Sequence, residues 1–315
     1  MQKENGRKTA GRRRHVGGGG QSVAQAVENA WKAGIVVVVA AGNDGRNNTV
    51  GTSGYGTIMA PGNDPYVITV GVMKDMSTAD RNDDRVASYS SKGPTLIDHV
   101  VKPDLVAPGN RIISLSNNSY LAGNSPGVNS VPVSYYWAKG TGTSSVYWQL
   151  SGTSMAAPMV SGAAALMLQK DPSLTPDLIK ARLMKTATKT FPAQSIATDP
   201  ATGKTYTSQY DLFTIGAGYL DVWAALNSTD NITGSAISPT AKYDSATGLI
   251  YIAGTPAATW SQTAVWGSTA VWGSTAVWGS KTNTGFTAVW GSTAVWGSSG
   301  KTGPESLSLL YYGEQ

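Results

Sequence analysis

The chain contains a run of five β-branched residues, Ile35 to Val39, that no polar side chain interrupts. Such a run is typical of a parallel strand that is covered on both faces. Before it, apolar residues recur at every fourth position from Val23 to Trp31 and Gly34 follows, which predicts an amphipathic helix that ends at this glycine. After it, a Gly-Asn-Asp-Gly turn occupies residues 42–45. Helix, strand and loop in this order indicate an α/β fold.

The same pattern continues to about residue 227. Further short strands are expected at Tyr66–Val72, Arg85–Tyr89, Leu105–Ala107, Arg111–Leu115 and Ser145–Leu150. Helices are expected at Thr153–Gln169, Pro176–Ala187 and Gly218–Leu226. Thr175 caps the second of these helices, because a threonine followed by proline is a favoured helix start. We therefore expect a parallel-sheet α/β domain over residues 21–228.

The positive charge of the chain is concentrated at its start. The net charge is +5, and residues 1–20 hold six basic residues and one acidic residue, so the rest of the chain is neutral. A nucleic-acid footprint needs basic residues on a folded face, so we predict a solvated basic arm instead. Residues 1–20 also lack the apolar stretch of a signal peptide. The absence of cysteine excludes thiol nucleophiles and disulfides.

The composition shifts toward Ser, Thr, Gly and Ala after Asn227, and residues 229–315 are expected to form a tail. Within it the hexapeptide Thr-Ala-Val-Trp-Gly-Ser recurs between residues 263 and 298 with an unbroken six-residue period. An even period places every tryptophan on one side of an extended chain. The tail is either a β-type array that binds or assembles through its aromatic rings, or a disordered low-complexity segment without a ligand.

The sequence from Ser151 to Leu166 predicts a strand, a turn of small residues and then a helix. Ser154 falls at the amino end of that helix, where unpaired N–H groups and the helix dipole would stabilise a developing oxyanion. A nucleophilic serine fits this position, and so does a plain capping serine. The position alone does not decide between them.

A second candidate is Asn43, in the turn after the buried strand. Ligands of open α/β sheets bind at the carboxyl ends of the strands, and an asparagine amide there can donate a hydrogen bond to an oxyanion. On its own, the Gly-Asn-Asp-Gly sequence is also common in turns that bind nothing.

Five segments taken together, from about Gln21 to Asn227, resemble the subtilisin-like serine proteases. They are Ala40-Ala41-Gly42-Asn43-Asp44-Gly45, Ser88-Tyr89-Ser90-Ser91-Lys92-Gly93-Pro94, Lys102-Pro103-Asp104-Leu105-Val106-Ala107-Pro108-Gly109, Ser151-Gly152-Thr153-Ser154-Met155-Ala156-Ala157-Pro158 and Gly216-Ala217-Gly218-Tyr219-Leu220-Asp221. The resemblance implies a serine endopeptidase that acts on polypeptides through an acyl-enzyme, with Ser154 as nucleophile and Asn43 as side-chain donor of the oxyanion hole.

The resemblance also implies a substrate-binding wall at Ala40, Ala41 and Gly42, with Gly62 nearby. It implies an extracellular location, and calcium is frequent in the family. No acidic cluster of this chain matches a family calcium site residue by residue, so the resemblance allows calcium but assigns no residue to it.

Two triad residues that the family uses do not occur where the resemblance requires them. The family's triad runs Asp, His, Ser along the chain. Its aspartate lies in Asp-Thr-Gly or Asp-Ser-Gly and its histidine in His-Gly-Thr-His, and neither motif occurs in the 42 residues before Asn43. His15 lies in the basic arm and His99 in a loop between two matched segments. A base must lie within hydrogen-bond reach of Ser154, so we expect neither histidine to serve and this chain alone to be inactive.

The leading interpretation is the carboxyl-terminal portion of a secreted bacterial subtilisin-like endopeptidase, truncated by deletion, frameshift or a misplaced start. An incomplete sheet exposes an unpaired edge, so we expect the chain to fold poorly alone. One alternative is complementation, in which a separate chain, such as the missing amino-terminal half, supplies the aspartate and histidine. Another is a non-catalytic binding or assembly protein that displays the tryptophan tail.

Overall fold

The computed structural model describes residues 18–48, 52–115, 129–231, 234–244, 249–253 and 313–314. The basic arm up to residue 17, with His15, and the Thr-Ala-Val-Trp-Gly-Ser repeats at 263–298 lie outside the described residues.

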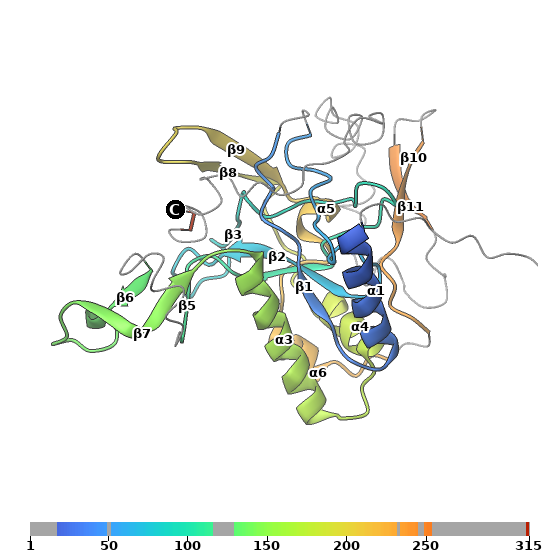
Figure 1. The fold of residues 1–315 in the computed structure, drawn as a ribbon, viewed down its shortest axis with the longest axis horizontal. Coiled ribbons are helices and arrows are strands. Elements are labelled where there is room, and N and C mark those ends of the chain that lie inside the picture. Colours follow the sequence, from blue (N-terminus) through green and yellow to red (C-terminus); the bar gives the residue numbers. More distant parts are fainter. Residues whose placement is uncertain are drawn as a thin grey trace, which may run out of the picture.

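The centre of the fold is a sheet of four strands, and it confirms the expected α/β architecture (Figure 1). The strands are β1 (Val38–Ala40), β2 (Ile68–Lys74), β3 (Arg85–Val86) and β4 (Leu105–Pro108). β2 pairs in parallel with β1 along one edge and with β4 along the other, while β3 runs antiparallel to the end of β2. The parallel strands β1, β2 and β4 therefore end at one edge of the sheet, where ligands of α/β folds bind.

Five helices and three smaller sheets surround this centre in the described part of the chain. The helices are α1 (Gly18–Lys32), α3 (Thr153–Lys170), α4 (Pro176–Thr186), α5 (Leu212–Ile215) and α6 (Val222–Asn227), with a 3₁₀ turn, η1, at Val133–Tyr135. The outer strands are β5 (Ile112–Leu115), β6 (Ser130–Pro132), β7 (Thr143–Leu150), β8 (Gln194–Thr198), β9 (Thr205–Gln209), β10 (Thr240–Asp244) and β11 (Leu249–Ala253).

Helix α3 packs across β1, β2 and β4. Its buried residues Ala156, Val160, Ala163 and Met167 recur at helical spacing, so one face of the helix packs on the sheet. The opposite face is covered by a second apolar cluster that includes Met73 of β2. β2 is buried along its whole length, as expected for a strand with both faces covered.

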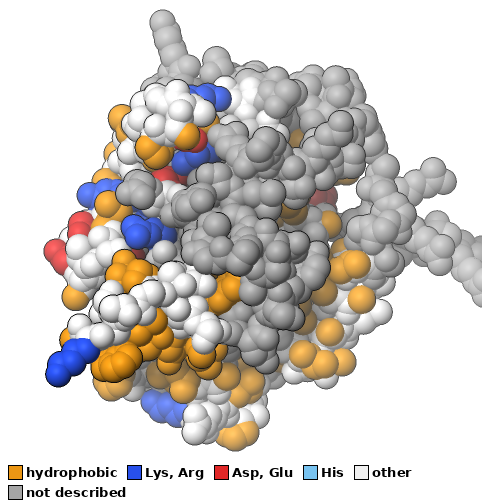
Figure 2. Space-filling model, turned by 60° about the vertical axis from the view of Figure 1, so that its left-hand side comes forward, with side chains coloured by type: hydrophobic (Ala, Val, Ile, Leu, Met, Phe, Trp, Pro, Cys, Tyr) orange, Lys and Arg blue, Asp and Glu red, His pale blue; other side chains and the backbone are white. Residues whose placement is uncertain are grey.

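The sheet β5–β7–β6 presents large apolar side chains to solvent. They are Ile113, Leu115, Tyr135, Tyr136, Trp137 and Val146, counting those of the adjoining turn η1. Figure 2, which brings this side of the molecule forward, shows apolar side chains gathered in the lower half of the surface.

Two expected elements need correction. The strand expected at Ile35–Val39 is β1, Val38–Ala40, which is only half-buried, and Ile35 is exposed. The reason is that β2 covers one edge of β1 and no strand among the described residues pairs with the other. The helix expected from Gly218 begins at Val222, because Gly218 has a φ of +130° and Tyr219 instead bridges to Val106 and Thr188.

The segment after residue 229 contributes to the same core as the body. Ala236 and Ala241 are fully buried, and Val100 forms a bridge with Thr240 of the β10–β11 hairpin. The hairpins β8–β9 and β10–β11 were not expected from the sequence.

A buried charge network joins β4, α4 and the segment after α6. The carboxylate of Asp104 lies 2.7 Å from Lys102 Nζ and 3.2 Å from Lys180 Nζ, and none of these three side chains is exposed. Ser238 donates its hydroxyl proton to the same carboxylate. Loss of hydration on burial lowers the pKa of Lys180 to about 7, against an ordinary value of 10.5. The Asp104 carboxylate opposes this shift, and the charge of Lys102 adds to it.

This network predicts a pH-dependent stability. Between about pH 7 and pH 10.5 the unfolded chain binds a proton at Lys180 that the folded chain does not, so the stability rises with pH by about 1.4 kcal/mol per pH unit from this group. Lys180→Met should remove about that much slope between pH 8 and 10, measured by urea unfolding. Lys185→Met removes a half-exposed lysine instead and should leave the slope unchanged. An unchanged slope in Lys180→Met would contradict the assignment.

None of the described helices is both long and apolar enough to cross a membrane.

Candidate functional site

Ser154 is the second residue of helix α3. Strand β7 ends at Leu150, Ser151 and Gly152 form the turn, and the helix begins at Thr153, so the predicted strand, turn and helix are confirmed. The turn is held by the Gly152 N–H, which donates to the Gly109 carbonyl over 2.9 Å. Ser154 is exposed, and neither its hydroxyl nor its N–H has a hydrogen-bond partner among the described residues.

Pro158 lies four residues after Ser154, inside the helix. Proline has no N–H, so the Ser154 carbonyl receives no helical hydrogen bond from this position. The Ser154 N–H thus has no partner among the described residues, and the Ser154 carbonyl lacks the hydrogen bond that a residue at position 158 would ordinarily donate.

Asn43 lies directly beside this turn. Its Oδ1 accepts hydrogen bonds from the Thr153 N–H at 2.9 Å and the Thr153 hydroxyl at 3.1 Å. Only the oxygen of an amide can accept from a backbone N–H, so these bonds fix which way the side chain is turned. The Nδ2 group then faces away from Thr153 and donates to no described residue.

Two glycines make this close approach possible. Gly42 has a φ of +111° and donates its N–H to Thr153 Oγ1 over 3.1 Å, which binds the loop to the helix start a second time. Gly152 has a φ of +147°, and a Cβ there would lie 3.2 Å from Asn43 Nδ2. Side chains at these positions would strain the backbone or crowd the amide.

The expected wall residues lie together in the fold. The Ala41 N–H donates to the Val70 carbonyl and its carbonyl accepts from Met59, so the chain from Ala40 to Gly42 extends the pairing of β1. Gly62 lies against this segment. A Cβ at Gly62 would be 2.9 Å from the Ala40 carbonyl oxygen. Met59 is exposed, and its side chain lies against Gly42. The structure therefore brings Ala40, Ala41, Gly42 and Gly62 to one place.

His99 lies elsewhere in the fold. Its N–H donates to the Thr95 carbonyl and its carbonyl accepts from Ala241, next to the bridge between Val100 and β10. Figure 1 shows β10 well separated from the start of α3. Half-burial lowers the pKa of His99 below its ordinary value. The structure thus does not place this imidazole beside Ser154.

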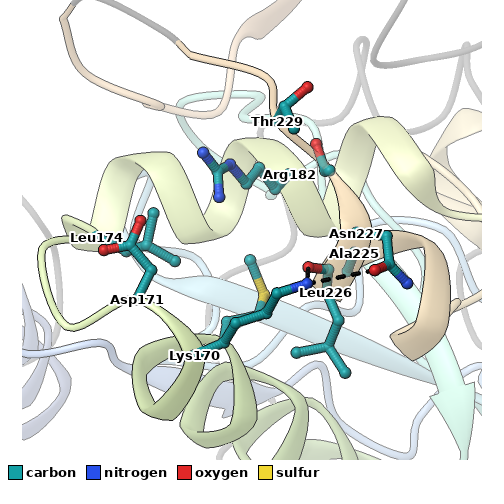
Figure 3. Close-up of a pocket in the computed structure, with 10 residues that line it drawn as sticks. Lys170, Asp171, Leu174, Arg182, Ala225, Leu226, Asn227 and Thr229 are labelled. Atoms are coloured by element: carbon teal, nitrogen blue, oxygen red, sulfur yellow. Dashed lines mark hydrogen bonds between the residues drawn. The ribbon is translucent and has the colours of Figure 1, made fainter.

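No group of His, Asp and Glu residues suited to a metal ion occurs in the part of the chain that the structure describes. A cavity of about 420 Å³ lies between α3, α4 and α6 (Figure 3). Lys170 on its rim donates to the Leu226 carbonyl and to Asn227 Oδ1. Neither Ser154 nor Asn43 lines this cavity, so we assign it no part in the candidate site.

Sequence reasoning missed the part played by Thr153. Its N–H and hydroxyl connect the Asn43 loop to α3 across 110 positions of sequence. The only signal in the sequence was that Thr153 immediately precedes Ser154 at the predicted helix start.

Comparisons with known proteins agree on one family. A profile of the subtilase family matches residues 9–218. The serine protease AprX of Bacillus subtilis (strain 168) is 47% identical over 165 residues, which cover 52% of this chain and 32% of AprX. Subtilisin DY of Bacillus licheniformis is 37% identical over 170 residues, which cover 54% of this chain and 46% of that protein.

Among solved structures, fervidolysin from Fervidobacterium pennivorans, described as a keratinolytic enzyme related to subtilisin, matches with a TM-score of 0.41 and 25% identity. The match covers 67% of this chain and 25% of fervidolysin. The chain thus spans less than half of the length of each of these relatives.

Proposed function

The chain belongs to the subtilase family, and on this premise we propose that it carries the nucleophile and the oxyanion donors of a serine endopeptidase site. One observation supports the proposal above the others. The two hydrogen bonds from Thr153 to Asn43 Oδ1 turn Nδ2 outward beside the first turn of α3, in the position an oxyanion donor needs.

In this proposal the Ser154 oxygen attacks the carbonyl carbon of the scissile peptide bond and loses its proton to a base. The carbonyl oxygen becomes an oxyanion, which accepts hydrogen bonds from Asn43 Nδ2 and the Ser154 N–H. The positive end of the α3 dipole adds to this stabilisation. The tetrahedral adduct then expels the amine, which takes the proton from the base, and water hydrolyses the remaining acyl-enzyme in the same way.

We further propose that the substrate is a polypeptide that lies along the segment from Ala40 to Gly42, with Gly62 behind it. The N–H and C=O groups of Ala41 and Gly42 are bonded within the fold, so this segment supports the proposal as an ordered wall beside the residue before the scissile bond. The expected extracellular location stays a prediction.

The base in this proposal is an imidazole that this chain does not supply. His99 lies toward β10, and His15 belongs to the basic arm, where the sequence predicts no strand or helix to position it. In subtilisin, loss of the triad serine or histidine lowers kcat by about 2 × 10⁶. By itself the chain is therefore proposed to have at most a residual activity, and a polypeptide that supplies the family's aspartate and histidine motifs is proposed to restore it.

Labelling with a fluorophosphonate, which reacts with activated serines, tests this proposal. We expect the chain alone to be labelled far below one probe per chain. Mixing it with a polypeptide that carries the Asp-Thr-Gly and His-Gly-Thr-His motifs should raise labelling of Ser154 toward one. Ser154→Ala should abolish the signal, whereas Ser161→Ala, at an exposed serine of the same helix, should not.

Two results would overturn the proposal. Stoichiometric labelling of the unmixed chain would show that a base is already present. Labelling that persists in Ser154→Ala would show that another residue is the nucleophile.

A further inference from the structure

A glutamate from late in the sequence is buried against the body of the fold. Glu314 is 4% exposed, and its carboxylate lies 3.0 Å from Arg46 Nη2 and 2.8 Å from Lys74 Nζ. The Ser88 N–H donates to the same carboxylate over 2.8 Å, and the Ser88 hydroxyl also donates to it. Both cationic side chains are only 7% exposed, so the carboxylate meets two desolvated positive charges.

The backbone N–H and C=O groups of Glu314 are hydrogen-bonded as well. The Glu314 N–H donates to Asn110 Oδ1 over 2.8 Å, and Asn110 Nδ2 donates to the Glu314 carbonyl over 2.9 Å. Gly313 has a φ of +69°, and a Cβ there would lie 2.6 Å from Arg111 Cγ and 2.7 Å from Ser151 Oγ. The site therefore fits a glutamate side chain, its peptide groups and a preceding glycine together.

The groups that bind Glu314 come from the ligand-binding edge of the sheet. Arg46 follows β1, Lys74 ends β2 and Asn110 follows β4, so the three lie where parallel strands end. Gly313 and Glu314 are drawn in red beside the mark C in Figure 1. Arg46 is held in place independently of Glu314, because it also pairs with Asp199 at 3.2 Å and stacks on the ring of Tyr206. A preformed cationic group of this kind is what a binding site for a carboxylate requires.

We propose that Arg46, Lys74, Ser88 and Asn110 form a glutamate-recognition pocket, the Glu314 pocket, which binds a Gly-Glu peptide segment and fastens residues 313–314 of the same chain to the body. The proposal thus fixes residues 313–314 to the same body that β10 and β11 contact. The proposal does not depend on the chemistry of Ser154.

A disulfide test addresses which segment fills the pocket. The natural chain has no cysteine, so the double variant Ser151→Cys with Gly313→Cys contains only the two introduced thiols. Both variants of this test also carry Arg111→Ala, because an ideal Cβ at Gly313 lies 2.6 Å from Arg111 Cγ. The same Cβ lies 2.7 Å from Ser151 Oγ, close to the roughly 3 Å that separates the Cβ of one cysteine from the Sγ of the other in a disulfide. We expect mild oxidation to give a monomer of altered mobility on a non-reducing denaturing gel.

The matched control pairs Gly313→Cys with Ser173→Cys, in the exposed turn between α3 and α4, and should not crosslink. A disulfide-linked dimer from the Ser151 pair would show that the segment comes from a second copy. Absence of any crosslink would show that the pocket does not hold residues 313–314. Either result overturns the proposal.

A peptide test addresses the chemistry of recognition in the full-length chain. Glu314→Gln weakens the internal ligand, so labelled Tyr-Tyr-Gly-Glu-Gln should bind this variant, measured by fluorescence anisotropy, about tenfold or more tightly than Tyr-Tyr-Gly-Gln-Gln. It should also bind the variant more tightly than the natural chain, whose pocket is filled. Adding Lys74→Met to the variant should remove the preference for glutamate. Equal binding of both peptides, no binding, or equal binding to the natural chain would overturn the proposal.

Discussion

Replacing Asn43 by aspartate is expected to lower the turnover number of the reconstituted enzyme by roughly 10²–10³ while leaving KM nearly unchanged. Aspartate has the shape of asparagine and keeps an oxygen for the two hydrogen bonds from Thr153. It replaces the outward Nδ2 donor by a second oxygen, which repels the developing oxyanion. Because the oxyanion exists only in the transition state, the loss falls on kcat rather than on substrate binding.

The matched control for this experiment is Asn43→Leu. Leucine removes the donor but also leaves the Thr153 N–H without its acceptor, so it should lose a similar factor in turnover and additionally lower the melting temperature. Asn43→Asp should melt close to the natural chain. If Asn43→Asp kept at least a tenth of the turnover, Asn43 would not be an oxyanion donor.

The local parts of this site could be predicted from the sequence. Ser154 was placed at a helix start because a strand, two small residues and an apolar helical pattern follow one another within a short stretch. Asn43 was placed at a strand end because a β-branched run stops just before it. Both inferences use neighbours in the sequence, whose geometry is set by the local backbone.

The contacts that bring these parts together could not be predicted in the same way. Nothing near Thr153 in the sequence indicates that its N–H and hydroxyl hold an amide 110 positions away. The helix expected from Gly218 was wrong for a related reason. Tyr219 is drawn into bridges with Val106 and Thr188, and these tertiary contacts override the local helical pattern.

Polar strands and buried charges were missed for a different reason. Strand β9, Thr205–Gln209, does not alternate apolar and polar residues. Its hydropathy pattern therefore does not predict a strand that pairs with β8. From the sequence alone, Glu314 and Asp104 are expected to be ordinary solvated carboxylates. In the structure both are buried beside cationic side chains. Charges inside a protein are identified by their partners, which sequence position alone does not reveal.

The second large effect is expected at Asp104. Asp104→Asn should lower the free energy of unfolding by about 3–5 kcal/mol, because it leaves two fully buried lysines, Lys102 and Lys180, facing a neutral amide. Burial by itself raises the pKa of Asp104, but the two ammonium groups outweigh this and lower it. The carboxylate is therefore ionised at neutral pH, and the substitution removes a full negative charge. Urea unfolding at pH 7 measures the loss.

The matched control is Asp230→Asn, which removes the carboxylate of the half-exposed pair with Lys185. Water screens that pair, so the expected loss is below about 1 kcal/mol. A similar loss in the two variants would show that the Asp104 network is no more important than a surface ion pair.

A rescue separates the unpaired charge from the shape of the side chain. Adding Lys102→Met to Asp104→Asn removes one of the two buried lysines that have lost their carboxylate, so the double variant should be more stable than Asp104→Asn alone although it has lost more polar contacts. Raising the pH should act in the same direction. Without the carboxylate both lysines favour the neutral form more strongly in the folded state, and deprotonation removes the buried charge. A double variant less stable than Asp104→Asn would instead assign the loss to broken hydrogen bonds.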